Sequence, residues 1–93
     1  MTIKEYCLQI NKLLEVIDNK QKSDLFLRLG NQYVTDKKEA LSNIKSLYGG
    51  MGSFNDMVLY TDGKFDIEAN EKLDVLKEIL YHAVLSEIIE SRI

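Results

Sequence analysis

Apolar residues recur at three- and four-residue intervals through most of this 93-residue chain, and no proline interrupts them. That spacing places apolar side chains on one face of an α-helix. It recurs in four segments: residues 3–17, 23–33, 36–48 and 66–92. The pattern predicts an all-α fold with one domain, residues 1–93. We expect a compact antiparallel helical bundle of four main helices.

Polar residues predict where these helices begin and end. Ser23 is expected to cap the second helix, with residues 19–22 as the link before it. Gly49 and Gly50 are expected to end the third helix through a residue at positive φ. Two pairs have the spacing of a capping box, in which a residue at the helix start and one three positions later bond each other's backbone: Thr2 with Glu5, and Asp36 with Glu39.

Residues 49–65 are the irregular part of the chain, and three of the five glycines lie within it at positions 49, 50 and 52. A Gly-rich loop and a short helix are expected at residues 49–60. The spacing of Ser53 and Asp56 favours a Gly-rich loop followed by a short helix over residues 53–60. The alternative is a strand through residues 57–60 that turns at Asp62–Gly63 into a small hairpin. An isolated hairpin is marginally stable, so the short helix is the preferred interpretation.

No group of residues predicts catalysis. His82 is the only histidine and lies on the last helix without the Cys/His cluster that a metal site needs. Cys7 lies on the apolar face of the first helix, where a free cysteine acts as a small hydrophobic residue. The GGMGS cluster lacks the Walker and Rossmann signatures, which favours a tight helix connection over a nucleotide site. We therefore expect a non-enzymatic protein without metal or cofactor; an enzyme that pairs His82 with a carboxylate is the weakest alternative.

The net charge and the apolar runs of the chain limit the classes of partner that it can bind. The formal net charge of −3 argues against direct nucleic-acid binding, which requires lysine and arginine to neutralise phosphates. No apolar run approaches the ~20 residues of a membrane span, and the N-terminal residues do not resemble a signal peptide. A single cysteine cannot form an internal disulfide. We expect a soluble cytoplasmic protein with no membrane partner.

The acidic residues are concentrated in the second half of the chain. Residues 1–48 carry eight basic and six acidic side chains, whereas residues 49–93 carry four basic and nine acidic ones. Such a run is usually a solvated helix face. An acidic helix face that also has aromatic residues and Met51 as anchors is suited to bind a basic protein partner. The predicted partner-binding residues are Phe54, Asp56, Tyr60, Asp62, Asp66, Glu68, Glu71, Asp74 and Glu78.

Residues 46–59, SLYGGMGSFNDMVL, resemble a motif of small bacterial proteins, some of which are encoded beside toxins. LYGGMGSFND is the specific part. In size, acidity and helical character the chain is also similar to the helical immunity proteins of contact-dependent growth inhibition systems. The resemblance implies an immunity protein that binds and neutralises a cognate toxin domain, often a nuclease. An acidic inhibitor would occupy the basic cleft of such a toxin.

The alternative function is a small regulatory or adaptor domain that acts by homo-oligomerisation. Its basis is the last helix, whose apolar residues extend beyond one narrow stripe. The residues beside the main face are Val75, Ile79, Leu85 and Ile89. A bundle of this size is not expected to bury all of them within one chain.

Overall fold

The computed structural model describes residues 2–17, 19–49 and 53–91. These residues form four α-helices, one short 3₁₀ helix and one two-stranded hairpin, so the predicted all-α fold is confirmed. In chain order the elements are α1 (Ile3–Val16), α2 (Lys20–Thr35), α3 (Lys37–Ser46), η1 (Phe54–Asp56), β1 (Tyr60–Thr61), β2 (Lys64–Phe65) and α4 (Ile67–Glu90). The body measures 47 × 23 × 22 Å.

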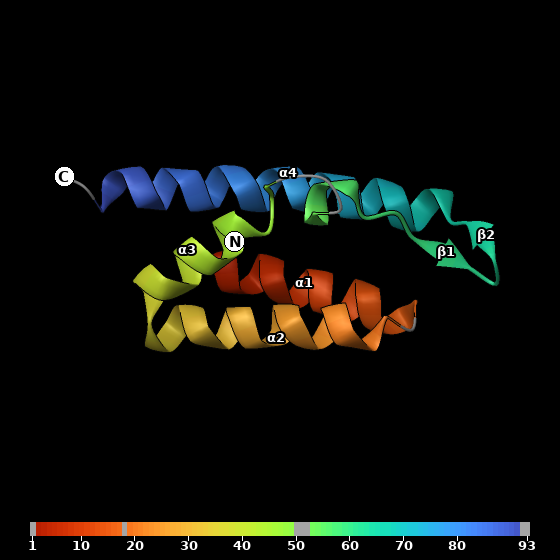
Figure 1. The fold of residues 1–93 in the computed structure, drawn as a ribbon, viewed down its shortest axis with the longest axis horizontal. Helices are drawn as coiled ribbons and strands as arrows, with labels where there is room; N and C mark the ends of the chain where they lie inside the picture. The colour runs from red at the N-terminus through yellow and green to blue at the C-terminus, as the bar shows by residue number, and fades with distance from the viewer. Residues whose placement is uncertain (1, 18, 50–52, 92–93) are drawn as a thin grey trace.

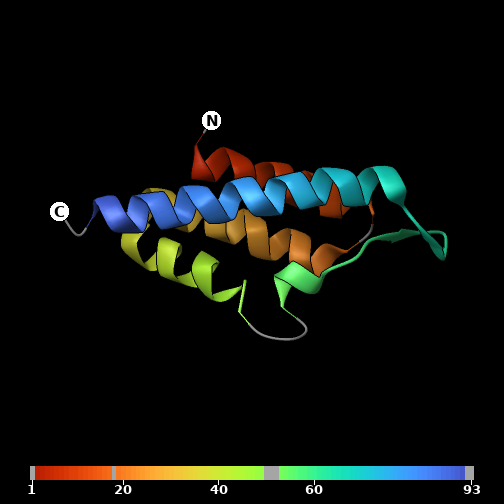
Figure 2. The same cartoon turned by 90° about the horizontal axis from the view of Figure 1, so that it is seen from above.

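The helices form an antiparallel bundle in which α4 runs along the length of the body (Figure 1). The helices α1 and α2 lie side by side in opposite directions, and α4 lies against α1. The short helix α3 is inclined and bridges α2 to α4 (Figure 2). The apolar stripes meet in one core, whose fully buried large side chains are Ile3, Cys7, Ile10, Leu14, Phe26, Ile44, Leu73, Leu80 and Val84.

Two of the predicted helix starts are confirmed. Glu5 N donates to Thr2 Oγ1 and Thr2 N donates to Glu5 Oε1, each at 3.2 Å, which completes the capping box of α1. Asp36 caps α3 by accepting from the backbone N–H of Glu39 at 3.3 Å. These local bonds satisfy N–H groups that have no partner within the helix.

The predicted start of α2 at Ser23 is wrong. Asn19 is the N-cap and accepts from the N–H of Lys22, so the supposed link is the first turn of the helix. The side chains of residues 20–22 are exposed, which is why this turn needs no apolar residue. Ser23 is buried and instead joins α2 to α1, since its Oγ donates to Asn11 O at 2.9 Å.

The end of α3 also differs from the prediction. The helix ends at Ser46, and its C-cap Leu47 keeps a right-handed helical backbone while donating to Ile44 O. Among the described residues only Asp62 and Gly63 have positive φ, so Gly49 does not end the helix in the expected way. Gly50 lies outside the described residues. A tightened last turn satisfies the free carbonyls here.

The short helix predicted over residues 53–60 is confirmed only for the three residues of η1. The hairpin alternative is confirmed for its turn at Asp62–Gly63, but its first strand is Tyr60–Thr61 and not residues 57–60. Tyr60 pairs with Phe65 across this hairpin. The φ values of Asp62 and Gly63, 53° and 76°, are those of a type I′ turn, the turn that suits a two-residue hairpin. Figure 1 shows the hairpin projecting at one end of the bundle.

Asn70 of α4 explains why so small a hairpin is stable. Its Oδ1 accepts from Leu59 N and its Nδ2 donates to Leu59 O, both at 2.8 Å, while Nδ2 also donates to Asp66 O at 2.7 Å. Both Asn70 and Leu59 are buried. One amide therefore pairs the backbone at the base of the hairpin with α4.

Replacing Asn70 with alanine should lower the free energy of unfolding by about 2 kcal/mol. The buried N–H of Leu59 loses its partner, and Leu59 O keeps only the bond from Asp66 N. Urea denaturation measures the change. Asn31→Ala is the matched control, since Asn31 is exposed in the middle of α2. Equal stability of the two variants would contradict the role given to Asn70.

Candidate interaction surface

A buried lysine of α4 forms hydrogen bonds with the described part of the 46–59 motif. Lys77 Nζ donates to Met57 O at 2.8 Å and to Asn55 O at 3.3 Å. Tyr48 closes the arrangement: its hydroxyl donates to Lys77 O, and its carbonyl accepts from Asn55 Nδ2. Burial lowers the pKa of Lys77 below its usual 10.5. We call residues 53–59 the clasp segment, and these contacts give it a structural role.

Phe54 belongs to the core and is not the exposed anchor that the sequence suggested. Its ring lies 4.7 Å from that of Phe26 and 5.4 Å from that of Tyr48, and the residue is only 6% exposed. Lys77 Nζ lies 5.6 Å from the ring centroid. Burying an aromatic ring is favourable wherever neighbouring elements leave space for it. Met51, the other expected contact near this loop, lies outside the described residues.

Two of the predicted carboxylates shape the hairpin. Asp62 occupies the left-handed turn position. Asp66 is the N-cap of α4: Oδ1 accepts from Ala69 N at 3.0 Å and Oδ2 accepts from the Thr61 hydroxyl at 2.7 Å. These two hydrogen bonds lower the pKa of Asp66 below its usual value of 3.8. The bond from the Thr61 hydroxyl has the larger effect, and the bond from the Ala69 backbone adds to it.

Asp66→Asn should reduce stability at neutral pH, and the difference from the wild type should close as the pH falls. The folded-state pKa lies below the unfolded value, so the carboxylate stabilises the fold above about 3.8 and ceases to do so once it is protonated in both states. Urea denaturation over an acid pH series measures this. Thr61→Val should show the same trend more weakly. A pH-independent difference would contradict the assignment.

The outer face of α4 carries four further predicted carboxylates. Glu71, Asp74 and Glu78 follow one another at three- and four-residue spacing, so they share one exposed face. Glu68 pairs with Lys72 at 3.2 Å, and Glu78 lies 4.0 Å from His82. Both pairs are exposed, so each contributes little to stability. Asp74 Oδ1 lies 3.8 Å from Nζ of the buried Lys77. All four carboxylates are nevertheless exposed to solvent, where a partner can reach them.

Exposed aliphatic residues lie among these carboxylates. Val75 is 56% exposed and Ile79 is 38% exposed. Both were noted in the sequence only as residues beside the main stripe. Asp56, the other predicted carboxylate, is exposed in η1. The outer face of α4 is therefore mixed, with apolar contact area between acidic groups.

The exposed aromatic residues lie on the hairpin. Tyr60, predicted as an anchor, is 57% exposed, and Phe65 opposite it is 54% exposed, with ring centroids 6.2 Å apart. Ile67 follows in the first turn of α4 and is also exposed. Phe65 and Ile67 are missing from the predicted site. The Asp62–Gly63 pair in the sequence could have identified Phe65, because a two-residue turn at these positions pairs Phe65 with Tyr60.

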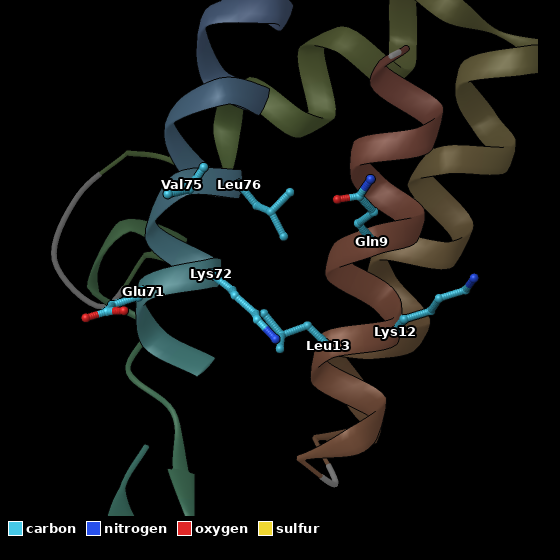
Figure 3. Close-up of a pocket in the computed structure, with 7 residues that line it drawn as sticks. All are labelled: Gln9, Lys12, Leu13, Glu71, Lys72, Val75 and Leu76. Atoms are coloured by element: carbon cyan, nitrogen blue, oxygen red, sulfur yellow. The ribbon is translucent and has the colours of Figure 1, made fainter. Parts of the chain in front are cut away.

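A shallow groove of about 550 Å³ lies between α1 and α4. Leu13 and Leu76 extend into it from opposite walls, and Lys72 reaches across toward α1 (Figure 3). Both leucines are half-buried. Glu71 and Val75 line the groove as well as the outer face of α4, so the two regions are continuous.

The two residues considered for catalysis occupy different environments. Cys7 is fully buried, as expected for a core residue, and burial raises its thiol pKa to about 12. His82 is exposed on α4. Within the described ranges, no group of three or more His, Cys, Asp or Glu residues is arranged to hold a metal ion. Among the same residues, no helix has the length and apolar character needed to cross a membrane.

Comparison with known proteins places the chain in a family. No curated protein and no solved structure matches it. Residues 18–67, more than half of the chain, match the family described as a domain of unknown function (DUF6966). The matched residues include α2, α3, the clasp segment, the hairpin and the N-cap of α4. This chain is therefore a member of the DUF6966 family.

Proposed function

We propose that the chain is an immunity protein that binds and neutralises a cognate toxin domain with a basic surface, of which a nuclease is the expected class. The observation that carries the proposal is the outer face of α4, where Glu71, Asp74 and Glu78 surround the exposed side chains of Val75 and Ile79. The resemblance of residues 46–59 to proteins encoded beside toxins supports a toxin as the partner. The cytoplasm is the expected place of inhibition.

The binding free energies expected of charged and apolar contacts differ, so the two kinds of residue have different roles. Exposed ion pairs contribute about 0–1 kcal/mol each, whereas nanomolar binding requires about −12 kcal/mol. Carboxylates therefore steer the basic partner, and buried anchors hold it. Tyr60 and Phe65 take the anchoring role, because both rings are more than half exposed and Phe54 is not.

Co-expression with the toxin domain of the neighbouring gene tests the proposal. Growth should be restored by the wild type and lost again with the triple variant Glu71→Lys, Asp74→Lys and Glu78→Lys. The matched control reverses three exposed carboxylates elsewhere, with the same change in net charge: Glu15, Asp24 and Glu39. A neighbour that is harmless, or that stays toxic beside the wild type, would reject the proposed function.

Homo-oligomerisation is the second candidate, and it is favoured by the exposure of Val75, Ile79 and Ile89. The expectation that one chain leaves some of these residues unburied is confirmed, although Leu85 is half-buried. In a two-fold dimer the same patch faces itself, so the carboxylates around Val75 would meet identical carboxylates. We therefore expect a monomer by sedimentation at micromolar concentration. A dimer that Val75→Lys dissociates would support this second candidate.

A further inference from the structure

We propose that a pocket between α4 and η1 binds one arginine side chain of the partner protein. The pocket has a volume of about 310 Å³ and is lined by Tyr48, Asn55, Asp74, Lys77, Glu78 and Tyr81. A volume at the low end for ligand pockets suits one side chain better than a whole cofactor. The inference rests on the proposed function only for the identity of the protein that supplies the arginine.

Two carboxylates of α4 lie at the pocket. Asp74 and Glu78 are one helical turn apart, so they share a side of the helix. Their side chains are 72% and 77% exposed. Asp74 Oδ1 lies 3.8 Å from Lys77 Nζ, and Glu78 Oε1 lies 4.0 Å from His82 Nε2. Both distances are longer than a hydrogen bond, so either carboxylate can turn to a cation without breaking one.

Two tyrosine rings supply the aromatic part of the lining. The ring centroids of Tyr48 and Tyr81 lie 4.8 Å apart, with the planes inclined at 45°. Tyr48 is buried and its hydroxyl donates to Lys77 O at 2.9 Å, whereas Tyr81 is only partly buried. A guanidinium group can stack on an aromatic ring while it donates two parallel hydrogen bonds to a carboxylate. An ammonium group has no plane to stack, so the pocket favours arginine over lysine.

Lys77 is the only cation among the described residues that line the pocket, and its ammonium group is directed at the backbone. Its Nζ donates to Met57 O at 2.8 Å and to Asn55 O at 3.3 Å. Burial lowers the pKa of Lys77, while the carboxylates of Asp74 and Asp56 favour its charged form. The lining thus has two carboxylates and one ammonium whose charge is shared with two carbonyls. This balance favours a cationic occupant.

A capped arginine tests the pocket without the toxin. The probe is Nα-acetyl-arginine methylamide, titrated into the ¹⁵N-labelled full chain. Amide NMR shifts should saturate in the millimolar range, which is typical of a single side chain, and should centre on Asn55, Glu78 and Tyr81. The citrulline derivative has the same shape without the charge and should give no saturable shifts. The lysine derivative has the charge without the plane and should bind about fivefold more weakly.

Two glutamine variants place the contact. Glu78→Gln should weaken binding of the capped arginine by about tenfold, since it removes the acceptor of a charge-assisted hydrogen bond. Glu71→Gln is the matched control and should leave binding unchanged, because Glu71 is equally exposed on α4 but lines the groove toward α1. Both positions are exposed, so neither substitution is expected to disturb the fold.

A third variant tests the aromatic part of the lining. Tyr81→Leu keeps apolar volume at this position but provides no ring, so the preference for arginine over lysine should disappear. Circular dichroism checks that this partly buried position has not unfolded the protein. If the folded variant kept the wild-type preference, the tyrosine ring would not be the stacking surface and the proposal would be overturned.

The outcomes separate this inference from the proposed function. An absence of saturable shifts, or equal binding of the arginine derivative and either of the other two, would overturn the pocket proposal, whatever the co-expression result. Equal weakening by Glu78→Gln and Glu71→Gln would also overturn it. A wild-type dimer that Glu78→Gln converts to a monomer would do the same, because the occupant would belong to a second copy. Selective binding that depends on Glu78 supports the pocket even if the neighbouring gene proves harmless.

Discussion

Replacing Phe54 with alanine should lower the free energy of unfolding by about 3–5 kcal/mol, the usual cost of deleting a buried aromatic ring. The ring packs against Phe26 and Tyr48, and Lys77 lies over it. A small domain has a total stability of about 5–15 kcal/mol, so this loss is a large share of it. Urea denaturation followed by far-UV circular dichroism measures the change.

Tyr60→Ala is the control for this prediction, because it removes an aromatic ring of similar size from the exposed hairpin. Its effect on stability should stay within about 0.5–1 kcal/mol. If Phe54→Ala were as stable as Tyr60→Ala and lost only toxin binding, Phe54 would be a contact residue after all. A partly unfolded Phe54→Ala protein gives no information on the interface, so binding is measured only on folded variants.

The helices could be predicted because their signals are local. Thr2 and Asp36 lie within three residues of the N–H groups that they cap, and apolar spacing fixes which face is buried. The start of α2 was misplaced because Asn19 and Ser23 are both good N-cap residues. Only the packing of Ser23 against Asn11 distinguishes them, and these two residues are twelve positions apart.

The clasp segment could not be predicted because its partners are distant in sequence. Lys77 of α4 is buried, and Asn55 O and Met57 O, about twenty positions earlier in the chain, accept from its ammonium group. A segment without helical or strand periodicity gives no sign of which side chain points inward. Phe54 and Tyr60 therefore looked equivalent, although one lies in the core and the other is exposed.

The acidic part of the candidate surface was more predictable than its anchors. Glu71, Asp74 and Glu78 share a face through helical spacing alone. Asp66 was expected on the same surface, but it caps α4 and bonds Thr61. The apolar contact area depends on the type I′ turn, which pairs Phe65 with Tyr60, and on the bundle leaving Val75 exposed.

The double variant Tyr60→Ala, Phe65→Ala should speed dissociation of the complex with the cognate toxin domain by about a hundredfold or more. Buried aromatic anchors typically cost about 2 kcal/mol or more on truncation, and tenfold in affinity corresponds to about 1.4 kcal/mol. Surface plasmon resonance on the folded variant measures both rate constants. The association rate should change little, because no charge is altered.

Reversing Glu71, Asp74 and Glu78 to lysine provides the kinetic contrast to this double variant. Charges on the outer face of α4 act at a distance before contact, so their reversal should slow association and remove most of its dependence on salt. The hairpin rings act only after contact, when they are withdrawn from water. If the double alanine variant dissociated at the wild-type rate while the charge reversal still slowed association, the carboxylates would steer the partner to an anchor elsewhere. The half-buried leucines Leu13 and Leu76 would then be the next candidates, since they line a groove that Glu71 also lines.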